Sequence, residues 1–569
     1  MRKAFAVALL AAGLAAVAAA TTARSGSPGF TTTQGAMIDP VAAGVTYEKI
    51  ISVGDTLSDG YMFESIPDGI SLATNGKGTV DLYVNHETST VPFTYTFTAA
   101  TGRGTGFNDF TNSLVSKLRL HQKSGGVLSG SYAISSDLNF QRFCSNFLAT
   151  EEHGFDRPLL LTNEEGIDWV NRTGTAWPAT IGAPEARQIG TVVAIDEKSG
   201  KVKPIWGMGR HNHENSVAIP GYGKPVVLSG DDSFVSNPAQ AQLYSYVAAD
   251  SDAVWNDEGD LWAFVANGVD DYYDFPIGSA TSVTGQFVKV PKDIATGHAP
   301  DGSDLMAADK GYPLPPNDGS WQRDPVTGLG LDGPQWVLEH WGDIQPQRVF
   351  QFTRVEDIAY DRRPGMQNVV YVVDSGRGAT SAGGNPFTSS NGRVWKLVLD
   401  KSDPTKVTSF SILIEGDDAQ VKAAAEIHQP DNLESTANSL LIQEDPGSSQ
   451  QFPVGSDVPG SPNFDPAATT ARVWQYNLAT GTMRVVAKVN QSADETSIDV
   501  DANPSKGNLG AWESSGIVDA SSVFGPGAFL LDVQAGTLVI DEEVRVEGVN
   551  TLTYQRDGGQ LGLLRIPGA

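Results

Sequence analysis

Cysteine is almost missing from this chain, because Cys144 is the only one among 569 residues. A lone cysteine excludes an internal disulfide and a zinc site built from paired cysteines. The sequence also lacks a Gly-x-Ser-x-Gly elbow, a Gly-x-x-x-x-Gly-Lys phosphate loop and a His-Glu-x-x-His motif. The hydrolase and nucleotide-binding classes that depend on these motifs are therefore disfavoured.

Positive charge is scarce as well. Lys and Arg number 39 against 67 Asp and Glu, for a formal net charge of −28 at pH 7. Nucleic acids and anionic membrane surfaces both require local positive charge in a partner, so we expect neither here. The acidic excess is compatible with simple solubility or with carboxylates gathered around bound cations.

The one long apolar run is at the N-terminus. Arg2 and Lys3 precede an uninterrupted apolar stretch over residues 4–20, and small residues follow up to Ala23. This pattern predicts a secretory signal peptide over residues 1–23, without a twin arginine, and hence a secreted or periplasmic protein. No later apolar run is long enough to span a membrane.

Repeated strand patterns dominate the rest of the chain. The 61 Gly and 32 Pro favour turn-rich β structure. Short apolar strands that end in polar or acidic residues recur six times, over residues 82–87, 159–165, 226–232, 369–374, 440–445 and 529–534. Each follows a strand with a polar opening, and most precede alternating strands around Gly-containing turns. Four strands in each of six units predict an all-β, six-bladed β-propeller.

One interval between units is much longer than the others, from Glu214 to Glu356. We interpret residues from about 250 to 345 as an insertion that is placed to cover one end of the propeller. The remainder of residues 24–569 then forms a single β-propeller domain. A seventh blade hidden in the insertion is the alternative.

Acidic residues stand at equivalent places in these units. The first strand of a blade is innermost and the second runs back antiparallel to it, so the start of one and the end of the other meet beside the central channel. The acids at these two places that we predict as ligands are Asp68, Glu87, Glu164, Glu165, Glu214, Asp231, Asp232, Glu356, Asp431, Glu444 and Glu513. Asp374 and Asp532 stand at the same strand ends, as the partners of Glu356 and Glu513. Two carboxylates 4 Å apart repel by about 4 kcal/mol at an effective dielectric of 20. Such a ring must therefore take up protons or bind cations.

The ligand types indicate which cations would bind. Carboxylate oxygens in number suit calcium, which takes six to eight oxygen ligands. Cys144 stands at the inner-strand position that acids occupy in the other units. A thiolate is a poor ligand for calcium and a good one for iron or another transition metal. The sequence predicts several calcium ions beside a softer, redox-capable metal, and a buried free thiol is the alternative interpretation of Cys144.

Basic residues near these acids indicate what else binds. Arg354 precedes Glu356 by two residues and points to the same side of a strand. It is either an ion-pair partner of the acids or a clamp for an anionic oxygen group such as phosphate. Arg210, His213 and His428 are further substrate-binding candidates, although the histidines are equally open to roles as ligands, proton donors or structural residues.

These residues also carry a family resemblance. From about residue 66 to residue 534 the chain resembles the PhoX-type alkaline phosphatases, which are secreted bacterial phosphomonoesterases. The matching segments are Pro67-Asp68-Gly69, Val84-Asn85-His86-Glu87, Cys144, Asn163-Glu164-Glu165, Gly209-Arg210 with His213-Glu214, Gly230-Asp231-Asp232, Arg354-Val355-Glu356, Pro430-Asp431 and residues 513–534. Each is short, and their order and spacing together carry the resemblance.

The resemblance implies a propeller with a pair of Fe³⁺ ions and several Ca²⁺ ions on the channel axis. It implies that Cys144, Glu214 and Glu356 hold iron and that Arg354 lies close to the phosphate. The chain departs from the family in having Val355 where the family has Pro, in lacking the twin-arginine signal, in its insertion, and in a divergent segment between Cys144 and Glu165.

We therefore expect an alkaline phosphatase, a monomer that acts on small phosphorylated substrates, with Arg354, Glu356 and Glu214 as catalytic residues. One alternative is a calcium-dependent propeller hydrolase of another ester, a lactone or a phosphodiester, for which Cys144 is dispensable. The other is a non-catalytic, calcium-stabilised extracellular propeller.

Overall fold

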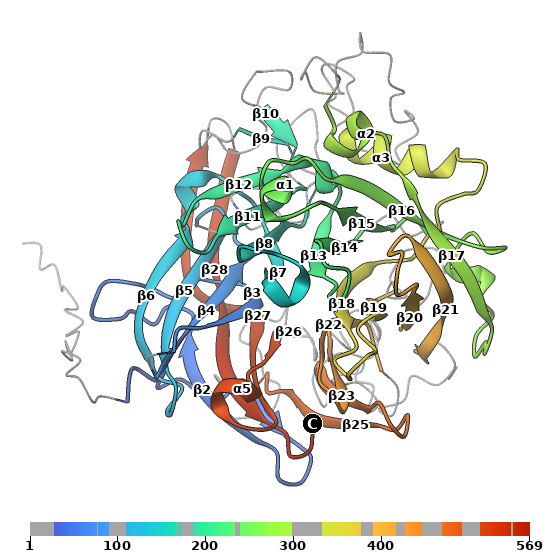
Figure 1. Ribbon diagram of the computed structural model, residues 1–569. Coiled ribbons are helices and arrows are strands. Elements are labelled where there is room, and N and C mark those ends of the chain that lie inside the picture. The colour runs from blue at the N-terminus through green and yellow to red at the C-terminus, as the bar shows by residue number, and fades with distance from the viewer. Residues whose placement is uncertain are drawn as a thin grey trace, which may run out of the picture.

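Six four-stranded blades are arranged around a central axis (Figure 1). This computed structural model describes residues 28–76, 78–89, 110–166, 169–171, 186–188, 190–233, 239–298, 333–376, 391–416, 427–445, 469–491, 512–547 and 550–569. The predicted signal peptide lies outside them. The protein is a six-bladed β-propeller, as the sequence predicted.

Each blade is built from four antiparallel strands, which follow one another from the axis outward. Blade 1 is β3 (Pro67–Thr74), β4 (Thr79–His86), β5 (Leu114–His121) and β6 (Val127–Ile134). Blade 2 is β7 (Phe143–Ala149), β8 (Leu159–Glu164), β11 (Val192–Asp196) and β12 (Val202–Ile205). Blade 3 is β13 (His213–Ala218), β14 (Val226–Asp231), β15 (Leu243–Val247) and β16 (Asp260–Ala266).

The second half of the ring repeats this order. Blade 4 is β18 (Val355–Tyr360), β19 (Val369–Asp374), β20 (Arg393–Leu399) and β21 (Lys406–Glu415). Blade 5 is β22 (Pro430–Ser435), β23 (Ser439–Glu444), β24 (Arg472–Asn477) and β25 (Met483–Val489). Blade 6 is β26 (Glu513–Asp519), β27 (Ala528–Glu547), β28 (Asn550–Arg565) and the N-terminal β2 (Thr46–Ser52).

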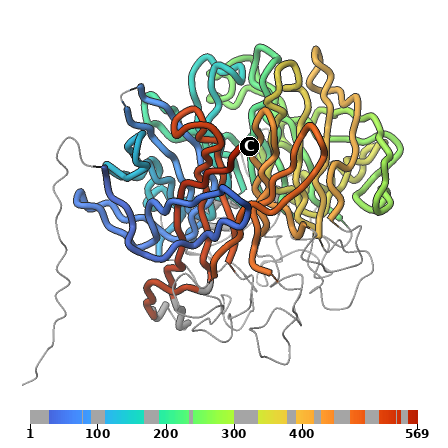
Figure 2. The backbone as a smooth tube through the Cα atoms, turned by 90° about the horizontal axis from the view of Figure 1, so that it is seen from below, coloured from blue at the N-terminus to red at the C-terminus, as the bar shows by residue number. Residues whose placement is uncertain are grey.

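The ring is closed by strands from the N-terminal part of the chain. β2 pairs with β28, so the fourth strand of the last blade precedes the first blade in sequence. β1 (Ile38–Pro40) pairs with β25 at the outer edge of blade 5. The six inner strands contact one another in circular order, with β26 beside β3, and this arrangement encloses the axis. Figure 2 shows the β27–β28 hairpin reaching beyond the other strands.

The stretch predicted as an insertion joins blades 3 and 4. Its first strand, β16, is the outer strand of blade 3, and β17 (Ser282–Lys289) pairs with both β16 and β21. Blades 3 and 4 therefore share one nine-stranded sheet, and the described residues of this stretch form no seventh blade. Its helices are α1 (Ser251–Trp255), η4 (Tyr272–Asp274), α2 (Lys292–Thr296) and α3 (Gly333–Asp343).

Short elements complete the described chain. They are the strands β9 (Trp169–Asn171) and β10 (Ala186–Gln188), the 3₁₀ turns η1 (Ser136–Leu138), η2 (Glu151–His153) and η3 (Trp206–Met208), and the helix α5 (Ser521–Phe524). Within the described residues, no helix has the length and apolar character that a membrane crossing requires.

The hydrophobic core lies between neighbouring blades. The second strands of blades 2 to 5 are buried along their whole length, as in residues 369–373, because both faces of a blade are covered by its neighbours. One cluster joins Leu161 of blade 2 to Val227 of blade 3. Another joins Leu82 of blade 1 to Leu530 of blade 6. This packing leaves the polar starts of the inner strands to face the axis.

Candidate metal centre

A β-bulge recurs at the start of five inner strands. In each of them the pairing with the second strand shifts, so that two residues oppose one. The first bulge residues of blades 1 to 5 are Asp68, Cys144, Glu214, Glu356 and Asp431. The bulge places these five side chains at equivalent positions beside the axis.

A second set of residues comes from the position directly after each second strand. In every one of these blades the backbone N–H of that residue donates to the carbonyl oxygen two residues before the first bulge residue, at 2.9–3.2 Å. The residues held in this way are Glu87, Glu165, Asp232, Ser375 and Asp445. Four of the five are acids, and they lie next to the bulge residues.

Together these side chains form four linked groups with atoms positioned to share a cation. The groups are Asp68–Glu87–Cys144, Cys144–Glu165–Glu214, Glu214–Glu356–Asp431 and Asp431–Asp445–Glu513. Within each group the candidate ligand atoms all lie within 4.8 Å of one another. Cys144, Glu214 and Asp431 each belong to two groups. We call these nine residues and Asp232 the axial cluster.

Cys144 lies among the acids of three blades. Its Sγ is 3.0 Å from Glu214 Oε1, 3.4 Å from Asp68 Oδ2 and 3.6 Å from Glu87 Oε1. Burial, and then repulsion from Asp68 and Glu214, raises the pKa of this thiol well above its usual range. A thiolate at this position therefore requires a cation beside it.

A glycine allows this close approach. A Cβ at Gly69, the second bulge residue of β3, would collide with backbone atoms of Ser145 and Asn146 in β7. Only glycine lets β3 and β7 approach this closely, and the approach brings Asp68 to Cys144.

Arg354 stands in the middle of the acids. Its guanidinium donates to both carboxylate oxygens of Asp232, at 2.7 and 2.6 Å, and to Asp445 Oδ2 at 3.1 Å. Its Nη2 is also 3.1 Å from Glu356 Oε1. One cation thus contacts acids from blades 3, 4 and 5, in the forked geometry that also suits a phosphoryl group.

In the axial cluster, buried carboxyl groups outnumber the positively charged side chains that contact them. Burial, followed by repulsion from neighbouring acids, raises the pKa of Glu87, Glu165, Glu214, Asp431 and Glu513. Burial also raises the pKa of Glu356 and of Asp445, and the Arg354 guanidinium opposes it in both. Near neutral pH these groups either retain protons or surround bound cations.

The axial cluster fits metal ions by two tests. Asp68 Oδ1 is buried and makes no hydrogen bond within the described chain, which leaves lone pairs for a cation. The same holds for both carboxylate oxygens of Asp532, which lies outside the cluster and whose pKa is raised by burial and by the charge of Asp68. Oxygens that are about 2.4 Å from one calcium ion lie at most about 4.8 Å apart, and the candidate ligand atoms of each group lie within this distance of one another. The all-oxygen groups suit calcium, and the groups that contain Cys144 suit a softer metal.

Three predicted ligands lie outside the axial cluster. Glu164, Asp231 and Glu444 each precede an axial residue by one position, so their side chains point to the other face of the strand. Glu444 binds Arg472 at 2.7 Å and Trp474 at 2.9 Å inside blade 5. Glu164 accepts from the backbone N–H of Gln141, and Asp231 lies 3.8 Å from His211 Nδ1.

The other predicted substrate-binding residues also have partners elsewhere. His213 contacts Ser229 Oγ at 2.8 Å and the Gly209 carbonyl at 3.1 Å, within its own blade and the turn before it. The guanidinium of Arg210 lies 4.5 Å from the Trp206 ring centre. The backbone N–H of His428 donates to Glu444 Oε1 at 2.7 Å. Arg354 is the predicted substrate-binding residue that the fold brings to the axial acids.

Three site residues were not among the predicted ones. Asp445 follows Glu444 as Glu165 follows Glu164, and that repeated acidic pair was the available signal. Ser375 donates its hydroxyl to Glu356 Oε1. Gln534 Nε2 donates to Asp68 Oδ2 at 2.9 Å and to Glu87 Oε1 at 2.8 Å. A lone Ser or Gln carries no comparable sequence signal.

Comparison with known proteins agrees with this architecture. The family model described as alkaline phosphatase PhoX matches residues 150–496. Among solved structures, Pseudomonas fluorescens PhoX in complex with vanadate, a transition state analogue, is 16% identical, with 94% of this chain and 98% of that chain covered and a TM-score of 0.51. At this identity the likeness shows the fold.

A protein of unknown function from Dyadobacter fermentans is 8% identical over 92% of this chain and 100% of its own, with a TM-score of 0.35. No curated protein matches the chain.

Proposed function

The chain belongs to the PhoX alkaline phosphatase family, and from this premise we propose that it is a secreted, metal-dependent phosphatase that hydrolyses phosphate monoesters at the axial cluster. The observation that carries the proposal is the position of Arg354. Its guanidinium contacts three acids of the cluster. A purely stabilising role does not account for such a network, because replacing buried ion pairs with apolar residues is often neutral or stabilising. A phosphate monoester beside bound cations gives this residue a function.

Two kinds of metal ion fit the cluster. We propose that Cys144, Glu214 and Glu356 hold iron, as the family resemblance implies: Cys144 and Glu214 share one group, and Glu214 links it to Glu356 in the next. The remaining carboxylates of the axial cluster are then the calcium ligands, namely Asp68, Glu87, Glu165, Asp232, Asp431, Asp445 and Glu513. Bound metal ions would supply positive charge to the phosphoryl oxygens and activate the attacking water.

The residues of this chain orient the substrate. Arg354 uses its forked donors to bind two oxygens of the phosphoryl group, in exchange for part of its present contact with Asp232 and Asp445. Asp374 fixes the backbone at Arg354, because its carboxylate accepts from Thr353 N and from Arg354 N, each at 3.0 Å. Ser375 fixes the Glu356 carboxylate by its hydroxyl hydrogen bond. These contacts hold positive charge in place where negative charge develops on the phosphoryl oxygens in the transition state.

The test is hydrolysis of 4-nitrophenyl phosphate by the full chain supplied with calcium and iron. We expect turnover by the parent and a large loss in Glu356→Gln. Turnover no faster than in that variant would refute the proposal. Bis(4-nitrophenyl) phosphate and 4-nitrophenyl acetate serve as competing substrates, and faster hydrolysis of either would assign a different ester class.

Two further expectations accompany the proposal. Export depends on residues 1–23, which lie outside the described chain, so the test is the N-terminal sequence of protein recovered from the medium or periplasm. We also propose a monomer, to be measured by light scattering.

A further inference from the structure

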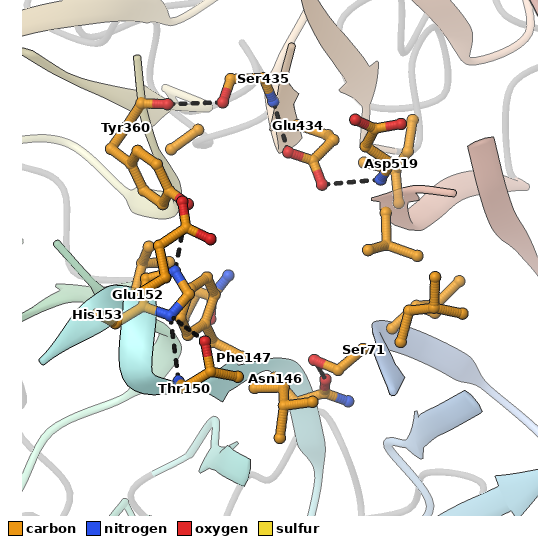
Figure 3. Close-up of a pocket in the computed structure, with 18 of the residues that line it drawn as sticks. Ser71, Asn146, Phe147, Thr150, Glu152, His153, Tyr360, Glu434, Ser435 and Asp519 are labelled. Carbon is orange, nitrogen blue, oxygen red and sulfur yellow. Dashed lines mark hydrogen bonds between the residues drawn. The ribbon is translucent and has the colours of Figure 1, made fainter. Parts of the chain in front are cut away.

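A cavity lies at the other end of the channel from the axial cluster. It has a volume of about 510 Å³ and is lined by residues from all six inner strands. The axial cluster uses the first residues of those strands, whereas the cavity uses their later residues, such as Leu72 and Tyr360. Figure 3 shows its labelled side chains arranged around an open centre. We call it the distal cavity.

Apolar side chains line part of the distal cavity, beside a larger polar part. Every inner strand contributes at least one apolar side chain, from blade 1 to blade 6 Leu72, Phe147, Val217, Ile358, Leu433 and Val518. The cavity volume is within the range of small-molecule sites, which are apolar pockets with a few placed polar groups. The wall therefore suits the apolar part of a small ligand.

The charged groups of the distal cavity are mostly negative. Arg362 is paired with Glu434 at 2.9 Å and lies 3.6 Å from Asp519 Oδ2, so one guanidinium faces two carboxylates. Glu152, on η2, adds a third. His153 adds no positive charge near pH 7, because burial lowers its pKa to about 4. Negative charge is thus in excess at this mouth.

Two further acids line the distal cavity, and no lysine of the described chain does. Glu197 is one of them. Asp357 is the other; its oxygens accept from Asn215 Nδ2 and from Leu433 N, the latter at 2.8 Å. Glu356, the preceding residue, belongs to the axial cluster, so the cluster and the distal cavity meet at the β18 bulge formed by Glu356 and Asp357. Burial raises the pKa of Asp357 to about 7, and Glu197 lies 4.0 Å from Lys117 Nζ, so the negative field comes chiefly from Glu152, Glu434 and Asp519. A concave site with low-dielectric walls focuses such a field and concentrates cations.

We propose that the distal cavity binds a small organic cation, with its ammonium group among the carboxylates of Glu152, Glu434 and Asp519 and its apolar body against the strand side chains. An aromatic amine suits the wall, because Phe147 and Tyr360 are among the residues that line it. This site is separate from the proposed phosphatase chemistry and does not depend on it.

The test is calorimetric titration of the calcium-saturated full chain with three isosteric probes. These are 2-phenylethylammonium, the neutral 2-phenylethanol and the anion phenylacetate. We expect the ammonium to bind and the alcohol to bind at least about tenfold more weakly, since it lacks the charge interaction. Equal binding of the ammonium and the alcohol, or no binding of the ammonium, would overturn the proposal.

Matched variants locate the site. Glu152→Gln should weaken ammonium binding about tenfold, whereas Glu151→Gln, an exposed neighbour on the same turn that does not line the cavity, should leave it unchanged. Val518→Phe should abolish binding by filling the cavity, with 4-nitrophenyl phosphate turnover as the readout that the axial cluster is intact. Binding that survives both Glu152→Gln and Val518→Phe would place the ammonium elsewhere and refute the proposal.

Discussion

Removal of the Arg354 guanidinium is the most informative perturbation of the axial cluster. In Arg354→Gln the acids Asp232, Glu356 and Asp445 lose their shared cation. A unit charge pair 3.1 Å apart, the distance from Nη2 to Glu356 Oε1, attracts by about 5 kcal/mol at an effective dielectric of 20. Desolvation offsets much of this, and breaking a buried pair typically costs about 3–5 kcal/mol of stability.

The effect on catalysis is separate from the effect on stability. Loss of one donor to a developing charge lowers turnover about 10²–10³-fold, which corresponds to about 2.7–4 kcal/mol of transition-state stabilisation. We expect Arg354→Gln to show both losses. The assays are denaturant unfolding and hydrolysis of 4-nitrophenyl phosphate per folded molecule.

Arg472→Gln is the matched control. The Arg472 side chain is 4% exposed, against 11% for Arg354, and it holds Glu444, the residue next to Asp445, at 2.7 Å, but on the face of β23 that points into blade 5. It should cost a similar unfolding free energy and leave turnover unchanged. Turnover in Arg354→Gln within about threefold of the parent, or an equal loss of turnover in Arg472→Gln, would refute the assigned role of Arg354.

Three further predictions concern the metal ions and the acid sensitivity of the fold. Cys144→Ser should leave a folded, calcium-binding protein with less iron, because a hydroxyl stays protonated and does not replace a thiolate for a soft metal. Its turnover should be at least about tenfold lower, a loss of about 1.4 kcal/mol of transition-state stabilisation. Unchanged metal content by elemental analysis would show that Cys144 has only a packing role. A chelator should lower the melting temperature, since only the folded chain binds the ions. When the free ion concentration is a hundred times the Kd of a site, binding at that site adds about 2.7 kcal/mol to the unfolding free energy. A melting temperature within error of the untreated sample would argue against a metal centre. Burial lowers the pKa of His86 to about 4 from 6.5, so between these values the unfolded chain binds a proton that the folded chain does not. His86 should therefore not reduce the unfolding free energy above pH 6.5, but should reduce it as the pH drops toward 4. In denaturant unfolding at pH 7 and pH 5, His86→Gln should lose less stability between the two pH values than the parent. An equal loss in both proteins would contradict the lowered pKa of His86.

The propeller was accessible from sequence because its units are local. Each blade repeats an apolar second strand and alternating outer strands within a continuous stretch of chain, so periodicity alone revealed them. Blade 6 is the exception, because its fourth strand, β2, comes from the opposite end of the chain. The joining of blades 3 and 4 by β17 was equally hidden, since it depends on pairing between residues more than a hundred positions apart.

What the sequence by itself determined was the set of acids at the starts of inner strands and the ends of second strands, with Cys144 and Arg354 among them. The tertiary structure alone decided which member of each acidic pair faces the axis. Glu165, Asp232 and Asp445 join the axial cluster while Glu164, Asp231 and Glu444 do not. Successive side chains of a strand point to opposite faces, so one residue of register separates a ligand position from a packing position. That register is set by the bulges and by packing between blades, and both arise only when the ring is assembled.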